Sequence, residues 1–140
     1  FAQQATGGSS NKIDEIVQFH VGETITAMAR CNLVPGGLQL VAYCTNMGGI
    51  GAFLPFGTRE DVDFFSHLEM HMRAHKAPLC GRDHLWFRSS YFPVKDVIDG
   101  DLCEQYTLLD ASKQRMIAEE LDRTPSEVMK KLEDIRNMML

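Results

Sequence analysis

No apolar run in this 140-residue sequence approaches the roughly 20 residues of a membrane-spanning helix, which excludes such a helix and leaves no membrane partner to expect. Positive charge is scarce as well. The 14 Lys and Arg face 19 Asp and Glu, which gives a formal net charge of −5 at pH 7. This acidic balance argues against binding that rests mainly on phosphate contacts. The 44% hydrophobic and 24% charged residues are typical of a globular protein.

Cysteines are few and widely spaced. The four of them, Cys31, Cys44, Cys80 and Cys103, follow one another at intervals of 13, 36 and 23 residues, without a C-x-x-C pair. We therefore expect reduced thiols rather than a disulfide framework. The chain begins at Phe1 without the basic and then apolar opening of a secretory signal, and we interpret it as a fragment of a longer protein.

Charge is nearly missing from residues 1–58, which hold five charged side chains, whereas the other 82 residues hold 12 positive and 16 negative ones. Nine of the 11 glycines also lie in residues 1–58. Glycine with alternating apolar residues is typical of strands and turns, and dense charge is typical of solvated helix faces. We expect an α+β chain with a flexible tail or linker at 1–11, strands within 12–57 and a helical domain over 58–140.

Alternating apolar residues predict four short strands near 17–21, 25–31, 38–44 and 50–54, joined by Gly-, Pro- and Asn-containing turns. A four-stranded antiparallel meander of this size is one β-propeller blade. A lone blade leaves its faces and edges uncovered. We expect the other blades to lie outside this sequence, and the isolated chain to self-associate or to be labile.

Four helices are predicted after residue 58. Thr58 is the expected N-cap of the first. Asp101 and Glu104 would cap a short second helix, and a third is expected over 112–121. The last helix opens with a cap, an N1 proline and an N3 glutamate at 124–127. Apolar faces at helical spacing predict the core: Phe64, Phe65, Leu68 and Met72 on the first helix, and Val128, Leu132, Ile135 and Met139 on the last.

A row of histidines raises the question of a metal site. His67, His71 and His75 recur every four residues along one helix side, with Cys80 and His84 just beyond. Imidazoles four residues apart can share a zinc ion, but this row follows the border of the apolar face and contains no His-Glu-x-x-His. We predict no metal and no cofactor, and also no catalytic residues, because the sequence carries no nucleophile elbow or phosphate-binding glycine loop. A zinc-dependent enzyme is the weaker alternative.

Aromatic and basic side chains alternate between residues 82 and 95. Such a stretch can pack between domains, anchor a protein partner or stack on RNA bases. The acidic balance of the chain favours the first two, with RNA nearby only indirectly. The candidate site residues for interdomain or partner contact are Trp86, Phe87, Arg88, Tyr91 and Phe92.

Several unusual sequence words occur in the same order in one protein family. They are GGIG at 48–51, LPF at 54–56, DFF at 63–65, PLCGRDH at 78–84, YFPVK at 91–95, VIDGDLCE at 97–104 and EELDRTP at 119–125. Over about residues 12–136 the chain resembles the C-terminal end of the subunit 3 family of splicing factor 3b. More distant relatives are the large subunit of the damaged-DNA-binding complex and the largest subunit of the cleavage and polyadenylation factor.

The resemblance implies a protein of three β-propellers and a C-terminal helical domain, with this chain supplying the last blade strands and that domain. It further implies a nuclear, non-enzymatic scaffold in the U2 snRNP. This scaffold would hold the HEAT-repeat subunit 1 and the small subunit 5 of splicing factor 3b during branch-site selection in pre-mRNA splicing. Upstream propellers of the same chain would be further contacts. A scaffold of a ubiquitin-ligase adaptor or of a cleavage factor is the alternative.

Overall fold

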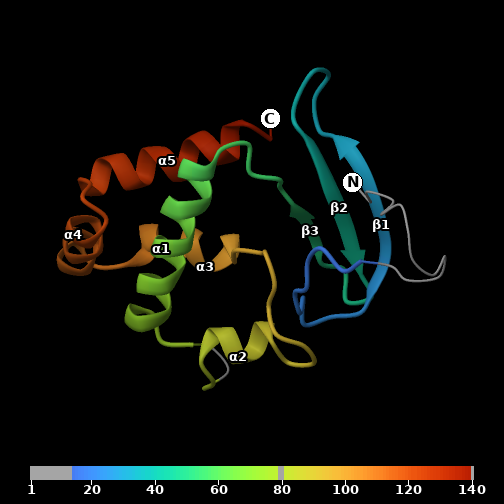
Figure 1. The fold of residues 1–140 in the computed structure, drawn as a ribbon, viewed down its shortest axis with the longest axis horizontal. Helices are drawn as coiled ribbons and strands as arrows, with labels where there is room; N and C mark the ends of the chain where they lie inside the picture. The colour runs from blue at the N-terminus through green and yellow to red at the C-terminus, as the bar shows by residue number, and fades with distance from the viewer. Residues whose placement is uncertain (1–13, 79–80, 140) are drawn as a thin grey trace.

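The computed structural model describes residues 14–78 and 81–139, so the expected tail at 1–11 lies outside the described residues. Strands come first and helices follow, which confirms the α+β class (Figure 1). The strands are β1 (Ile25–Asn32), β2 (Gln39–Thr45) and β3 (Ile50–Phe53). The helices are α1 (Arg59–His75), α2 (His84–Arg88), α3 (Gly100–Glu104), the 3₁₀ helix η1 (Gln105–Leu108), α4 (Ala111–Glu120) and α5 (Pro125–Asn137). None of these helices is long and apolar enough to cross a membrane.

The three strands form one antiparallel sheet in the order β1-β2-β3. Side chains that are paired across neighbouring strands lie on the same face of a sheet. The register therefore separates two faces of different size. The larger face carries Met28, Arg30, Val41, Tyr43 and Phe53. The smaller face carries the small residues Ala27, Ala29, Ala42, Cys44 and Ala52, and also Cys31, Leu40 and Ile50.

The expected first strand at 17–21 does not join the sheet, so the four-stranded meander is wrong. Gln18 instead forms an isolated antiparallel bridge with Lys95, in which each N–H donates to the other residue's carbonyl at 3.0 Å. The N–H of His20 donates to the carbonyl of Arg88 at 2.9 Å. The alternation of apolar residues indicated an extended, half-buried segment correctly, but this segment finds its hydrogen-bond partners in α2 and the loop that follows it.

Side-chain caps fix the ends of the long helices. The hydroxyl of Thr58 accepts a hydrogen bond from the N–H of Asp61 at 3.1 Å and so begins α1. At α5, Thr124 and Glu127 form the predicted capping box, in which the carboxylate of Glu127 accepts the N–H of Thr124 at 2.7 Å. The predicted N-terminal signals of the first and the last helix are confirmed in place.

The cap of α3 differs from the prediction. Its N-cap is Asp99, whose Oδ1 accepts the N–H of Leu102 at 3.2 Å, while Asp101 and Glu104 lie inside the helix. The observed N-cap lies two residues before the predicted one. Side chains from other elements also bind Asp99, and the local spacing of residues cannot reveal these contacts.

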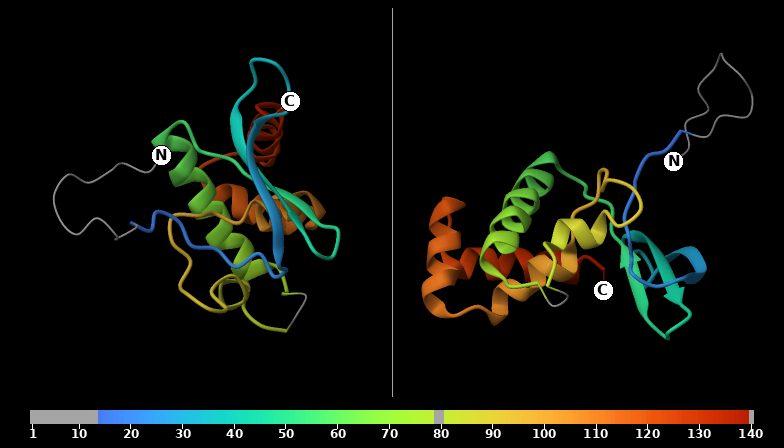
Figure 2. Two further views of the ribbon diagram at one scale, coloured as in Figure 1. Left: turned by 90° about the vertical axis from the view of Figure 1, so that its right-hand side faces the viewer. Right: turned by 90° about the horizontal axis from the view of Figure 1, so that it is seen from below.

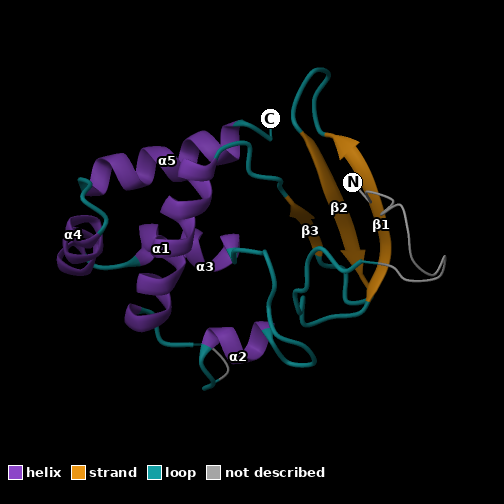
Figure 3. Cartoon of the chain, viewed as in Figure 1, coloured by secondary structure: helices purple, strands orange, loops and turns teal. Residues whose placement is uncertain are grey.

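The hydrophobic core lies among the helices, which gather on the side of the molecule opposite the sheet (Figure 3). The predicted faces of α1 and α5 contribute to it through buried Phe65, Leu68, Met72, Val128 and Leu132, with Phe64 and Ile135 partly buried. The sheet has almost no core of its own. Within the described part of the chain, its strands contribute only Leu40 and Thr45 to the buried residues.

Candidate contact site at the sheet and helix junction

The short helix α2 lies between α1 and the sheet (Figure 2). Asp83 caps it by accepting the N–H of Leu85 at 3.3 Å, and the same carboxylate accepts a hydrogen bond from Nη2 of Arg73 on α1 at 3.1 Å. The bond from Arg73 lowers the pKa of Asp83 below its usual value. The cap and the ion pair together fasten α2 to α1.

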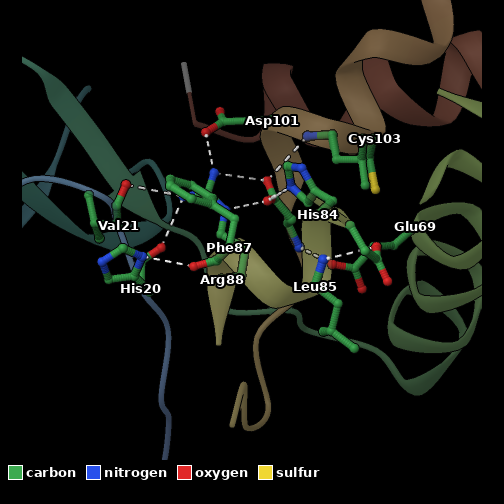
Figure 4. A network of polar contacts seen from close by, with 12 residues as sticks. His20, Val21, Glu69, His84, Leu85, Phe87, Arg88, Asp101 and Cys103 are labelled. Atoms are coloured by element: carbon green, nitrogen blue, oxygen red, sulfur yellow. Dashed lines mark hydrogen bonds and ion pairs between the residues drawn. The ribbon is translucent and has the colours of Figure 1, made fainter. Parts of the chain in front are cut away.

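Arg88, the last residue of α2, forms a buried ion pair with Asp99. The two residues are 9% and 1% exposed. Nε of Arg88 lies 2.5 Å from Oδ2 of Asp99, and Nη2 lies 3.4 Å from Oδ1, so the pair is bidentate. Nη1 donates to the backbone carbonyls of His20 and Val21 at 3.1 and 3.2 Å (Figure 4). One guanidinium thus joins the segment before β1 to the start of α3.

Two further side chains complete the surroundings of Asp99. Nε2 of His84 forms a hydrogen bond with its Oδ2, and the carboxylate of Glu69 accepts its N–H at 2.9 Å. Burial alone would raise the pKa of Asp99, but the hydrogen bonds from Arg88 and His84 outweigh it and hold that pKa below its usual value. Burial raises the pKa of Glu69. The junction therefore contains a carboxylate that is stabilised in its charged form.

Aromatic rings surround the Arg88 guanidinium. Its central carbon lies 4.5 Å from the ring centroid of Phe19 and 5.1 Å from that of Phe87, which is a cation–π arrangement. Phe19 in turn packs edge to face on Phe53 of β3, with centroids 5.8 Å apart. Nδ1 of His20 lies 2.8 Å from the carbonyl oxygen of Phe87. These contacts fill the space between α2 and the larger face of the sheet.

The structure divides the five predicted site residues into two groups. Phe87 is half-buried and Arg88 is buried, and both lie at the junction of the sheet and the helices. Trp86, Tyr91 and Phe92 are 72%, 80% and 67% exposed, so packing of these three against the helices is wrong. A five-residue helix has one inward face, and Phe87 and Arg88 occupy it. Contact of the other three with a partner remains a prediction.

Sequence reasoning missed the groups that hold Arg88. Asp99 and His20 are not among the candidate site residues predicted from the sequence. The partners lie 11 and 68 residues from Arg88, so no local spacing connects them. The sequence does offer one signal for these partners. Arg88 directly follows Leu85, Trp86 and Phe87, and a cation in a stretch that packs inward needs a buried counter-charge.

Two of the histidines considered as metal ligands take part in other contacts. Nδ1 of His67 lies 2.7 Å from the backbone oxygen of Asp63, and His84 is bound to Asp99. Cys80, the thiolate considered as a zinc ligand, lies outside the described residues. Among the residues that are described, no group of three His, Cys, Asp or Glu side chains is arranged to hold a metal ion.

Comparison with known proteins assigns the chain to a family. The family model described as the CPSF A subunit region matches residues 2–108, and the chain belongs to this family. Within it, the chain is a homologue of splicing factor 3B subunit 3. It is 59% identical over 138 residues to spliceosome-associated protein 130 A of Arabidopsis thaliana, and 59% identical over 129 residues to splicing factor 3B subunit 3 of Danio rerio. It is 55% identical over 140 residues to the probable splicing factor 3B subunit 3 of Dictyostelium discoideum.

These matches cover 99%, 92% and 100% of the chain. The chain spans only 11% of the length of each of the three relatives. The resemblance found in the sequence words is thereby confirmed.

Proposed function

We propose that this chain acts as part of a non-enzymatic scaffold subunit of the splicing factor 3b complex of the U2 snRNP, in the nucleus. It would support branch-site recognition in pre-mRNA splicing through protein–protein contacts. Two findings support the proposal. The relatives carry the names of splicing factor and spliceosome-associated proteins, and the chain itself leaves large surfaces that need a partner.

The observation that carries the proposal is the uncovered sheet. None of the eight residues of β1 is buried, and its outer edge pairs with no strand in the described part of the chain. Open edges attract further strands, and a small sheet is stable only when other structure covers it. We infer that residues 12–57 are the last blade strands of a β-propeller, that neighbouring blades cover them, and that residues 58–140 form the helical domain that follows.

The smaller face of the sheet supports this inference. Ala29, Ala42 and Ala52 stand side by side across the three strands, so a second sheet could approach closely. Covering several hundred Å² of such surface would contribute several kcal/mol at roughly 25 cal/mol per Å². A neighbouring blade of the same protein would supply this cover.

The exposed aromatic residues supply a second kind of contact. Trp86 lies within α2, Tyr91 and Phe92 lie in the loop that follows it, and all three are exposed; aromatic side chains dominate the energetics of protein interfaces. We infer that they contact a protein partner, with the HEAT-repeat subunit 1 and the small subunit 5 of splicing factor 3b as the candidates. RNA contact would be indirect, because the chain is acidic.

Capture of these two subunits by the purified chain tests the proposal. The triple variant Trp86→Ala, Tyr91→Ala and Phe92→Ala should capture them at least roughly tenfold less well, since each anchor is worth about 1 kcal/mol or more. The matched control is Leu108→Ala with Met116→Ala, which removes exposed apolar side chains elsewhere on the chain and should leave capture unchanged. Equal capture by all three proteins would contradict the aromatic contact. Recovery of a ubiquitin-ligase or cleavage-factor subunit instead would favour the alternative scaffolds.

A further inference from the structure

Two hollows lie side by side, the first between the sheet and α2 and the second between the turn after β2 and the loop after α2. The first has a volume of about 250 Å³ and the second about 350 Å³, and both are lined by Gly22 and Glu23. We propose that they form one binding site for an arginine side chain presented by an extended segment of a partner protein. The site is separate from the exposed Trp86 and Phe92, which line neither hollow.

Glycines keep the first hollow open. A Cβ atom on Gly49 would lie 2.8 Å from Oγ1 of Thr45 and 3.0 Å from Oε2 of Glu23. A Cβ atom on Gly22 would lie 2.7 Å from the tip of the Phe87 ring. Because the contacts at 2.8 Å from Gly49 and 2.7 Å from Gly22 are shorter than real Cβ contacts allow, any larger residue at either position would fill the space. The small residues therefore leave the Glu23 carboxylate accessible.

The charge of the site is negative. Among the residues that the structure describes, Glu23 is the only Asp, Glu, Lys or Arg in the lining of either hollow. Its Oε2 accepts a hydrogen bond from the Thr45 hydroxyl, and its Oε1 has no hydrogen-bond partner among the residues that the structure describes. One carboxylate oxygen is thus positioned by the sheet, and the other can accept from a ligand.

Neighbouring groups extend the negative field. The pKa of Tyr43, whose ring lines the first hollow, is raised first by burial and then by the Asp101 carboxylate, with smaller contributions from Asp99 and Glu23 in the same direction. Only Arg88 opposes them. A cation in the hollow would relieve this excess of negative charge, whereas a phosphate would be repelled.

The walls favour a guanidinium over other cations. Rings of Tyr43 and Phe87 line the first hollow, and the ring of Tyr91 lines the second. A planar guanidinium stacks on aromatic rings and donates two parallel hydrogen bonds to a carboxylate, which a compact ammonium cannot do. The chain already uses this chemistry internally, where Arg88 lies over Phe19 and binds Asp99. Asn46 and Thr24 in the second hollow can hydrogen-bond the backbone of the segment.

Titration of the ¹⁵N-labelled chain with short peptides tests the proposal directly. The probes are acetyl-Gly-Gly-Arg-Gly-Gly-amide and the same peptide with citrulline or lysine in place of arginine. Citrulline has nearly the shape of arginine without its charge. We expect the arginine peptide to shift the amide signals of Gly22 and Gly49 at millimolar concentration, and to bind roughly fivefold more tightly than the citrulline peptide.

A protein variant supplies the complementary test. Glu23→Gln should weaken binding of the arginine peptide roughly fivefold, and the control Glu120→Gln, at the exposed end of α4, should leave it unchanged. The proposal is overturned if the arginine peptide causes no shifts, if citrulline binds equally well, or if the lysine peptide binds more tightly. The peptide comparison needs no variant and holds even if Glu23→Gln disturbs the fold. Tyr91, which the capture variant changes, also lines the second hollow, so a loss of capture does not by itself support this site. The peptide titration uses the unchanged chain, so either proposal can fail alone.

Discussion

Arg88 places its Nε atom 2.5 Å from Oδ2 of Asp99, and water reaches almost none of either side chain. Removing two charges from water costs free energy that their attraction must offset, so such a pair adds little net stability over a well-packed apolar pair. Its main effect is geometric, because only one arrangement of α2 and α3 satisfies both groups. The loss of a single partner is costly, since the other charge is then left unpaired.

Substitution of Asp99 should therefore destabilise the chain strongly. We expect Asp99→Asn to lower the free energy of unfolding by about 3–5 kcal/mol, measured by urea denaturation. The control is Asp101→Asn. Its side chain is 87% exposed and lies 3.4 Å from Nη2 of Arg88, so the loss should stay below about 1 kcal/mol. Equally small losses in both variants would show that the buried pair does not hold the junction.

Loss of the Asp99 charge in acid should lower the free energy of unfolding. The pKa of Asp99 in the folded chain lies below its ordinary value of 3.8, so this carboxylate contributes stability that is fully present above about pH 4 and is lost as the pH falls through the folded pKa. Glu69, whose pKa is raised, acts in the opposite sense. Arg88 is the cation that faces the site, and His84 is the other side chain that bonds to the Asp99 carboxylate.

Unfolding free energies of the wild type and Asp99→Asn, measured from about pH 6 to about pH 2, isolate this contribution. The difference in unfolding free energy between the two proteins should be large near the upper pH limit and should shrink towards the lower pH limit. A difference that stays constant over the whole range would contradict the assigned pKa direction.

Gly22 should not tolerate a side chain. Its φ of +99° favours glycine, and an added Cβ would meet the Phe87 ring at 2.7 Å. We expect Gly22→Ala to cost about 2–3 kcal/mol in thermal or urea unfolding. Gly48→Ala is the matched control, because Gly48 has a φ of +87° but open space around it, so it should show the backbone cost alone, about 1 kcal/mol. Equal costs at both positions would argue against close contact with Phe87.

Neighbouring aromatic residues of α2 should differ sharply in their effect on stability. Phe87 contacts Gly22, His20 and Arg88, so we expect Phe87→Ala to lower the free energy of unfolding by about 2–3 kcal/mol. Trp86 is 72% exposed, and Trp86→Ala should change it by less than about 0.5 kcal/mol. Unfolding curves of the two variants that shift equally would refute the inward placement of Phe87.

Features that depend on neighbouring residues were predictable from the sequence. The capping box at Thr124 and Glu127 and the cap at Thr58 place the ends of α5 and α1, because each bond joins residues three apart. The three strands of the sheet were recognised too, since tight turns join consecutive strands. The path of residues 17–21 was not, because the bridge from Gln18 to Lys95 joins positions 77 apart, which no local pattern encodes.

The candidate site was predictable in part for the same reason. The aromatic and basic stretch indicated that α2 makes contacts, and Phe87 and Arg88 do so within the chain. The sequence could not show which side chains face inward, because this depends on where a five-residue helix begins and on the carboxylate that meets Arg88. Asp99 supplied that carboxylate while also capping α3, and only its capping role was visible locally.

The hydrogen bonds from Arg88 to the carbonyls of His20 and Val21 limit how this chain can be divided. Composition suggests a domain boundary near residue 58. If the two parts were expressed separately, however, the Arg88 guanidinium would lose these two hydrogen-bond acceptors and its contact with the Phe19 ring. The helical half would then carry an incompletely satisfied cation at its surface. A more stable fragment for experiments keeps residues 14–24 attached to the helices, even if the strands β1 to β3 are replaced by a linker.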